Sequence, residues 1–243
     1  MKYFIVADVH GFYDEMMEAL TAAGYDKDNS SHCFVSLGDL FDRGRQPQEC
    51  LDFVMSIPAE RRILIYGNHE DLMERAIARH GWVFADRTNG TSETAKILTR
   101  NWSDEVAAVY DIRNHRLYNE YIRSCVMYHE TPHYIFVHGW IPCEMRFSDE
   151  YNYVSNWREA PLDKWKAAGW YNGMKAWKDG VRETNKTICC GHWHTSWGNH
   201  FLHKQGEEFG PTAVFTPFID CGIVALDACT IYSRMVNCYV VED

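Results

Sequence analysis

The chain has 243 residues, of which 46% are hydrophobic and 24% are charged, and its formal charge at pH 7 is −10. This length and composition are typical of an ordinary globular protein with one substantial core. The negative charge argues against nucleic acid or an anionic membrane as the main partner, because phosphate groups are bound mainly by Lys and Arg.

The amino terminus and the cysteines bear on the cellular compartment in which the protein is expected. Residues 3–7 form an apolar run that is too short for a signal peptide and predicts a first strand. No apolar run reaches membrane-spanning length. The nine Cys include no CxxC pair, and the adjacent Cys189 and Cys190 would point to opposite faces of a strand. We therefore expect reduced, mostly buried thiols in a cytoplasmic protein.

The first part of the chain alternates between strand and helix patterns. Apolar runs at 3–7, 33–37 and 63–66 predict strands, and apolar residues at helical spacing predict helices that begin near Phe12 and at Pro47. The short connections indicate parallel strands joined by right-handed crossovers. The carboxyl ends of these strands should therefore meet at one edge of a sheet.

Polar side chains come directly after each of these three strands. They are Asp8, His10, Asp39, Asp42, Asn68 and His69. A random scatter of surface residues gives no reason for this placement, whereas α/β folds bind ligands in the crevice beyond the carboxyl ends of their strands. We expect the six side chains to converge there.

Residues 81–131 have a helical pattern without strands, and Thr91 and Ser103 are candidate helix caps followed by acidic residues. We interpret this stretch as a helical insertion that packs over or beside the sheet. The insertion would lie within a single domain that spans residues 1–243.

Two later apolar runs, 134–137 and 187–190, predict strands that end at His138 and at His192-Trp193-His194. The segment between them is rich in Trp and Tyr, which we expect to pack a loop-rich lobe rather than to form a binding box. Residues 218–241 predict antiparallel strands that close a second sheet. The expected architecture is of the α/β class: two mixed sheets between helical layers, a four-layer α-β-β-α sandwich.

The polar groups at five strand ends predict a metal centre. Carboxylate and imidazole ligands without a thiolate suit divalent ions such as Mn, Fe or Zn, and their number exceeds one tetrahedral site. Two ions about 3.5–4 Å apart, sharing one carboxylate, would activate water for in-line attack at phosphorus. Arg43 is a planar, bidentate donor suited to phosphoryl oxygens. The residues therefore favour phosphate chemistry over carbon hydrolysis.

Five segments, in this order, resemble the calcineurin-like metallophosphoesterases. They are Asp8-Val9-His10-Gly11, Gly38-Asp39-Leu40-Phe41-Asp42-Arg43-Gly44, Gly67-Asn68-His69-Glu70, His138-Gly139 and Gly191-His192. The second and third are similar to those of the serine/threonine phosphoprotein phosphatase group, and the compact length is similar to that of its bacterial and phage branch, the lambda phosphatase type. The segments span most of the chain, and all five in order are a specific pattern.

The resemblance implies a set of metal ligands. Asp8 and His10 would bind a first ion, Asp39 would bridge both ions, and Asn68, His138 and His192 would bind the second. We expect manganese, with iron or zinc as alternatives. His194 resembles the second His of a His-x-His motif in the wider superfamily, which binds the first ion, whereas the phosphatase branch usually has Thr-Pro after its His. Both ligation and packing remain open for His194.

The resemblance also implies catalytic roles. His69 would be the general acid, oriented by Asp42, and Arg43 would hold the phosphoryl group. Asn156-Trp157-Arg158 resembles a later Trp-Asn-Arg segment of the family, so Arg158 would join Arg43. The implied activity is hydrolysis of phosphate monoesters on phosphoproteins or small phosphorylated molecules.

Three alternatives stay open on the same residues. A dinucleoside polyphosphate hydrolase could use the aromatic lobe to stack a base. A nuclease is favoured by His-x-His and disfavoured by the acidic charge. A metal-binding or partner-binding scaffold without catalysis would be expected to have lost some of the ligands or proton-transfer groups, and all of them are present.

Overall fold

The computed structural model describes residues 1–145 and 150–243. Its first sheet has the strand order β11-β1-β2-β3. These strands are β1 (Lys2–Val6), β2 (His32–Ser36), β3 (Arg62–Leu64) and β11 (Cys238–Glu242). The first three are parallel to one another, and β11 runs antiparallel to β1 at the edge. The short βαβ connections thus place the carboxyl ends of three strands side by side, as the sequence predicts.

The second sheet has the order β4-β5-β8-β10-β9. Its strands are β4 (His129–Glu130), β5 (Tyr134–Phe136), β8 (Thr187–Cys190), β9 (Phe218–Asp220) and β10 (Ile223–Ala225). The central three are parallel and the two edge strands are antiparallel to their neighbours. A separate hairpin pairs β6 (Glu144–Met145) with β7 (Tyr151–Asn152).

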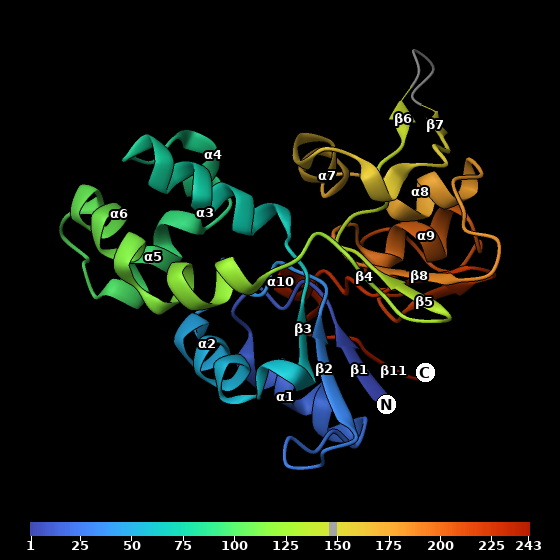
Figure 1. The fold of residues 1–243 in the computed structure, drawn as a ribbon, viewed down its shortest axis with the longest axis horizontal. Coiled ribbons are helices and arrows are strands. Elements are labelled where there is room, and N and C mark those ends of the chain that lie inside the picture. The colour runs from blue at the N-terminus through green and yellow to red at the C-terminus, as the bar shows by residue number, and fades with distance from the viewer. Residues whose placement is uncertain (146–149) are drawn as a thin grey trace.

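Helices cover the outer faces and form an extension beside the first sheet (Figure 1). The helices before residue 125 are α1 (Tyr13–Ala22), α2 (Pro47–Ser56), η1 (Ala59–Arg61), α3 (Asn68–Arg79), α4 (Phe84–Thr88), α5 (Thr91–Thr99), α6 (Glu105–Asn114) and the π-helical turn η2 (Leu117–Ile122). The later ones are η3 (Trp157–Glu159), α7 (Leu162–Ala168), α8 (Gly173–Lys178), α9 (Thr195–Phe201) and α10 (Thr230–Ser233). Among the described residues no helix is both long and apolar enough to cross a membrane.

Three hydrophobic clusters hold the layers together: one between the first sheet and the helices of the first half, one between the two sheets, and a third on the far side of the second sheet. Along β1, Phe4 and Val6 face the cluster shared with the helices of the first half, whereas Ile5 faces the cluster between the two sheets. This alternation follows from the two-residue period of a strand. Each such buried side chain contributes about 1.5–3 kcal/mol to folding. Cys189 lies in the layer between the sheets and Cys190 in the third cluster, on the far side of the second sheet. The four-layer α-β-β-α sandwich is confirmed.

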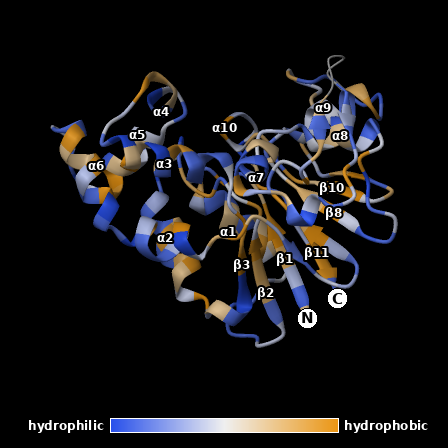
Figure 2. Ribbon diagram, turned by 45° about the horizontal axis from the view of Figure 1, so that its top comes forward, coloured by the Kyte–Doolittle hydropathy of each residue, from blue (hydrophilic) through white to orange (hydrophobic). Residues whose placement is uncertain are grey.

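Hydropathy follows the same layered arrangement: Figure 2 shows apolar strands in both sheets beneath helices of mixed polarity.

Most of the described aromatic residues of the second half pack against other side chains, as expected. Trp157 is fully buried, Trp165 and Trp177 are 7% and 9% exposed, and all three belong to the third cluster. Trp170 differs, because 42% of it is exposed.

Two details of the sequence-based prediction were wrong. The last strand does not close the second sheet, because β11 pairs with the free edge of β1. The predicted caps are also displaced by one residue: Gly90 precedes α5, and the Asp104 carboxylate caps α6 by accepting from Val106 and Ala107 N–H groups. Residues 81–131 hold α4, α5, α6 and η2, together with β4 at their end.

Candidate active site

The loops after β1, β2 and β8 place their polar residues in an uncommon backbone conformation. Six of them have positive φ: Asp8 (50°), His10 (53°), Asp39 (53°), Asp42 (63°), Arg43 (65°) and His192 (64°). This conformation costs about 1–2 kcal/mol for each non-glycine residue. Hydrogen bonds between the first two loops support it, including one of 3.0 Å from the His10 N–H to the Asp39 carbonyl. Such concentrated strain, held by its surroundings, is typical of functional sites.

Two glycines let these loops approach the carboxylates. A Cβ atom on Gly67 would overlap Asp39 Oδ1, and one on Gly191 would overlap Asp8 Oδ2. Glycine is therefore required at both positions by the close packing of backbone against carboxylate. This explains physically why these glycines precede Asn68 and His192.

Asp39 is the centre of the cluster. Its Oδ1 accepts the backbone N–H of His69 at 2.9 Å and lies 3.4 Å from His138 Nε2, while its Oδ2 lies 3.7 Å from His69 Nε2. Burial would raise the pKa of the Asp39 carboxyl, but His138 and His69 hold it well below its usual range. The carboxylate is ionised and can face cations.

Two groups of candidate ligands share Asp39. One is His10, Asp39 and His69, and the other is Asp39, His138 and His192; within each group the ligand atoms lie within 4.8 Å of one another. A single carboxylate between two sets of imidazoles fits a pair of divalent ions that share one ligand. The donor set therefore fits the metal centre that the sequence predicts.

Backbone carbonyls orient two of the imidazoles. His10 Nδ1 lies 3.0 Å from the Phe41 carbonyl, and His138 Nδ1 lies 2.7 Å from the Leu37 carbonyl. The Nε2 atom of each ring is thereby directed into the cluster, a pattern common among metal-binding histidines. His138 Nε2 also lies 2.7 Å from Asn68 Oδ1. Burial works against a charged His138 ring, but Asp39 outweighs it and raises the pKa to about 10.

Asp8 follows β1 of the first sheet and His192 follows β8 of the second, and the two residues are in contact. Asp8 Oδ2 accepts the backbone N–H of His192 at 2.8 Å, and the Asp8 carbonyl accepts the Thr230 hydroxyl at 2.9 Å. Burial and the nearby Asp227 raise the pKa of Asp8, whereas burial and His138 lower the pKa of His192 to about 3. His192 is therefore a neutral imidazole, the form that binds metal.

His69 and Asp42 form the buried pair that the sequence suggests. His69 Nδ1 lies 2.7 Å from Asp42 Oδ2, and the same oxygen accepts the Thr91 hydroxyl at 2.7 Å. Burial lowers the pKa of His69, but Asp39 and Asp42 together raise it above its usual value. Sequence reasoning took Thr91 for a helix cap, since nothing in its local pattern shows that the insertion reaches Asp42.

Two buried carboxylates were missed from the sequence. Glu70 accepts the backbone N–H groups of Gly67 at 2.9 Å and Asp39 at 3.1 Å, and burial together with Asp39 raises its pKa to about 7. Asp227 is 7% exposed and accepts the Cys229 N–H at 2.7 Å. Glu70 is the last residue of the third family-like segment, and this membership could have pointed to it from the sequence. Asp227 follows a strand without a recognisable motif, so the sequence offered no comparable indication.

Arg43 reaches over the cluster. Its guanidinium lies 2.8 Å from His10 Nε2 and 3.1 Å from His69 Nε2. Because both contacts are on the ring atoms that face the cluster, a phosphoryl group bound there would meet this guanidinium. The guanidinium thus lies beside two of the predicted site imidazoles, and its role in phosphoryl binding stays a prediction.

The other two predicted residues have their contacts elsewhere. Arg158 makes bonds of 2.9 and 2.6 Å to Glu130 and one of 3.1 Å to Glu183. His194 Nε2 lies 3.1 Å from Glu208 Oε1. Over the part of the chain that is described, neither side chain belongs to the two ligand groups around Asp39. The predicted ligand Asp8 is also outside these groups, and His69, predicted as the general acid, is inside one of them.

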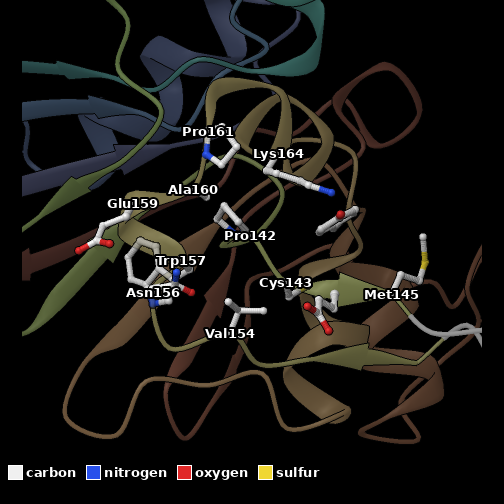
Figure 3. A pocket seen from close by; sticks show the side chains of 12 residues that line it. Pro142, Cys143, Met145, Val154, Asn156, Trp157, Glu159, Ala160, Pro161 and Lys164 are labelled. Atoms are coloured by element: carbon white, nitrogen blue, oxygen red, sulfur yellow. The ribbon is translucent and has the colours of Figure 1, made fainter.

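A separate cavity of about 510 Å³ lies in the second lobe, between the β6–β7 hairpin, η3 and α7 (Figure 3). Pro142, Val154, Trp157 and Pro161 give it apolar walls, and Lys164 is the cationic residue of its lining. Its lining includes none of the residues of the Asp39 cluster.

Comparison with known proteins finds one family model that matches most of the chain. The model of the calcineurin-like phosphoesterase family matches residues 1–215. The chain is 39% identical over 70 residues to a symmetrical bis(5'-nucleosyl)-tetraphosphatase of Psychromonas ingrahamii, covering 29% of this chain and 24% of the relative. It is 36% identical over 76 residues to an asymmetrical bis(5'-nucleosyl)-tetraphosphatase of Bacillus velezensis, covering 28% and 30%. These matches span less than a third of either relative.

The same fold is found in a cold-active protein-tyrosine phosphatase of a psychrophilic Shewanella species. The structural match has a TM-score of 0.54 and covers 100% of this chain and 75% of that protein, at 17% sequence identity. At this identity the likeness shows the fold alone.

Proposed function

Because the chain belongs to the calcineurin-like phosphoesterase family, we propose that it hydrolyses phosphate monoesters, on phosphoproteins or small molecules, with two divalent metal ions. The observation that carries the proposal is the position of Asp39, whose carboxylate is shared by two groups of buried imidazoles. A scaffold that only bound a partner would not need this arrangement beside a His69–Asp42 pair and an arginine.

We assign the ligands as the family resemblance implies. Asp8, His10 and Asp39 would hold one ion, and Asp39, Asn68, His138 and His192 the other. Bound ions of this kind neutralise charge on phosphoryl oxygens and make water a better nucleophile. The mixed carboxylate and imidazole donors suit manganese, and also iron or zinc.

The chain's own residues would bind the phosphoryl group and deliver the proton. In the structure the Arg43 guanidinium contacts the Nε2 atoms of His10 and His69 at 2.8 and 3.1 Å. When a phosphoryl group binds, the Arg43 guanidinium would contact its oxygens instead of the two imidazole rings. His69 Nε2 would then be free to carry a proton. Asp42, at 2.7 Å from Nδ1, would hold the ring in place while Nε2 donates to the leaving oxygen.

Arg158 and His194 have weaker support. Arg158 would have to leave Glu130 and Glu183 to reach a substrate, so phosphoryl binding is assigned to Arg43 alone. His194 would have to exchange Glu208 for a metal ion. A specific observation also favours a second candidate function, the hydrolysis of dinucleoside polyphosphates, because the curated relatives carry that name.

The test is a substrate profile of the purified, manganese-loaded protein. Nitrophenyl phosphate, a serine phosphopeptide, ATP and diadenosine tetraphosphate are compared, and Asp39→Asn serves as the inactive reference. The proposal expects release of inorganic phosphate from the monoesters by the wild type and its loss in Asp39→Asn. Equal rates in the two proteins, or no hydrolysis of any ester by the metal-loaded wild type, would refute it.

A further inference from the structure

We propose that the segment Asn89-Gly90-Thr91, at the junction of α4 and α5, positions the two groups that would act on the phosphate ester, the Arg43 guanidinium and the His69–Asp42 pair. The inference rests on the proposed function and extends it, because it gives the helical insertion a part in the reaction. The two outer residues of the segment are positioning residues, since they would act through Asp42 and Arg43 and not on the substrate itself.

The Thr91 hydroxyl holds the carboxylate that orients His69. Thr91 Oγ1 donates to Asp42 Oδ2 at 2.7 Å, and the same oxygen lies 2.7 Å from His69 Nδ1. All three side chains are buried. A carboxylate oxygen with two hydrogen-bond partners in fixed positions cannot turn without losing one of them. The hydroxyl therefore fixes the direction from which Asp42 meets the imidazole ring.

The position of this hydroxyl is set by the packing of α5. Thr91 is the first residue of the helix, so the Asp42 carboxylate lies at the amino-terminal end, where the helix dipole favours negative charge. Further along α5, Ala95 and Leu98 are buried in the same hydrophobic cluster as residues of α2 and α3. Packed helices position side chains more precisely than free loops do. The packing of the insertion is thereby transmitted to Asp42.

The other two residues of the segment contact Arg43. Asn89 Oδ1 accepts from Arg43 Nη2 at 3.4 Å, and the same nitrogen lies 3.1 Å from His69 Nε2. Gly90 has a φ of 86°, and a Cβ atom on it would lie 2.6 Å from the Arg43 backbone nitrogen. Glycine is required there by both the left-handed conformation and the close approach. The segment thus touches the backbone and the guanidinium of Arg43 at once.

A role in packing alone would not need the Thr91 hydroxyl. Valine has nearly the same shape and would fill the same space, and a buried hydroxyl costs free energy unless it is hydrogen-bonded. The partner of this hydroxyl is a carboxylate 49 residues away in sequence, next to the arginine that Asn89 contacts. Three consecutive residues of the insertion therefore contact two consecutive residues of the loop after β2.

The first test compares Thr91→Val, which keeps the shape of the side chain, with Thr91→Ser, which keeps its hydroxyl. In the manganese-loaded protein Thr91→Val should lower kcat about tenfold on a serine phosphopeptide and change it little on nitrophenyl phosphate, whose leaving group needs little protonation. KM should stay unchanged on both, and Thr91→Ser should restore kcat. Thr99→Val is the matched control, because Thr99 lies at the other end of α5 and donates at the same distance, 2.7 Å, to the Ala95 carbonyl.

The second test is calorimetric titration of the manganese-loaded protein with inorganic phosphate. Asn89→Ala should weaken phosphate binding by roughly two- to tenfold, because the Arg43 guanidinium loses a neighbour that orients it. Asn101→Ala is the control: it removes an amide beyond the far end of α5 that donates to Asp111 at 3.3 Å, and it should leave the affinity unchanged.

A third measurement, NMR of the zinc-loaded protein, does not depend on turnover. The ring N–H resonance of His69, assigned by its loss in His69→Ala, should exchange faster with water in Thr91→Val and keep its wild-type exchange rate in Thr91→Ser and Thr99→Val.

The inference would be overturned by equal losses of kcat on the two substrates in Thr91→Val, or by no loss on the phosphopeptide. It would also be overturned by an unaltered phosphate affinity in Asn89→Ala, by an equal loss in Asn101→Ala, or by an unchanged exchange rate of the His69 resonance in Thr91→Val. A failure of the proposed function appears separately, as absent ester hydrolysis by the metal-loaded wild type. The phosphate titration and the His69 resonance still decide the inference in that case.

Discussion

The leaving-group dependence of a His69→Ala variant follows directly from the geometry of the His69–Asp42 pair. His69 is 4% exposed, its Nδ1 lies 2.7 Å from Asp42 Oδ2, and its Nε2 faces the candidate phosphoryl site. A positioned general acid contributes roughly 10²–10⁴-fold when the leaving oxygen is strongly basic. We therefore expect His69→Ala to lose about this factor in kcat on a serine-phosphate peptide, and much less on nitrophenyl phosphate, whose leaving group needs little protonation.

The assay measures kcat on both substrates for proteins with equal metal content. His133→Ala is a matched control, because His133 Nδ1 lies 2.6 Å from Asp243 Oδ1 in a second His–Asp pair outside the site. Asp42→Asn adds a pH test. Since Asp42 is one cause of the raised pKa of His69, its neutralisation should lower that pKa and move the alkaline fall of kcat on the phosphopeptide to lower pH.

Equal losses on the two substrates in His69→Ala, with metals bound, would refute this reasoning. His69 would then bind or stabilise the phosphoryl group instead of donating a proton. A pH profile that does not move in Asp42→Asn would refute the orienting role of that carboxylate.

Three further predictions test separate parts of the structure. Thr91→Val removes the hydroxyl that donates to Asp42 at 2.7 Å and should lower the free energy of unfolding by about 1.5–3 kcal/mol in denaturant titrations, whereas an unchanged midpoint would show that this bond contributes nothing. His194→Ala should weaken metal binding by about 10–100-fold if this ring binds or orients a ligand, and an unaltered titration would leave it as packing against Glu208. Arg158 and Lys186 lower the pKa of Glu130 from 4.5 to about 2, so ionised Glu130 stabilises the fold fully above pH 4.5 and loses this contribution as the pH falls toward 2. Glu130→Gln should therefore melt below the wild type at pH 7 and converge with it in acid, and a difference that grows in acid would contradict the assignment.

Most of the layered fold could be predicted because periodicity and local connection length determine it. The strands before Asp8, Asp39 and Asn68 are apolar runs joined by helices, and this pattern leaves a parallel sheet as the simplest arrangement. The pairing of β11 with β1 could not be predicted, because a terminal strand carries no local signal for the sheet it joins. Only the packing of the complete chain determines which edge remains available.

The site shows the same division between local and distant information. Residues that follow strands of the first sheet, such as Asp39 and His69, could be predicted to converge, since one sheet edge brings them together. His138 follows a strand of the second sheet, so its place beside Asp39 was implied by the family resemblance. Thr91 and Asp227 could not, because they reach the site from an insertion and from a strand without a motif. The ion pairs of Arg158 with Glu130 and Glu183 are likewise contacts between distant segments, so its motif alone could not locate it.

The most direct test of the shared-carboxylate centre is electron paramagnetic resonance of the manganese-loaded protein, combined with elemental analysis of its metal content. The wild type and the surface control Asp52→Asn should each hold two manganese ions in a spin-coupled pair, because Asp39 lies in both ligand groups. Asp39→Asn should hold markedly less than two ions and lose the coupling. A wild type that binds a single uncoupled ion, or a coupled pair that survives Asp39→Asn, would contradict the account.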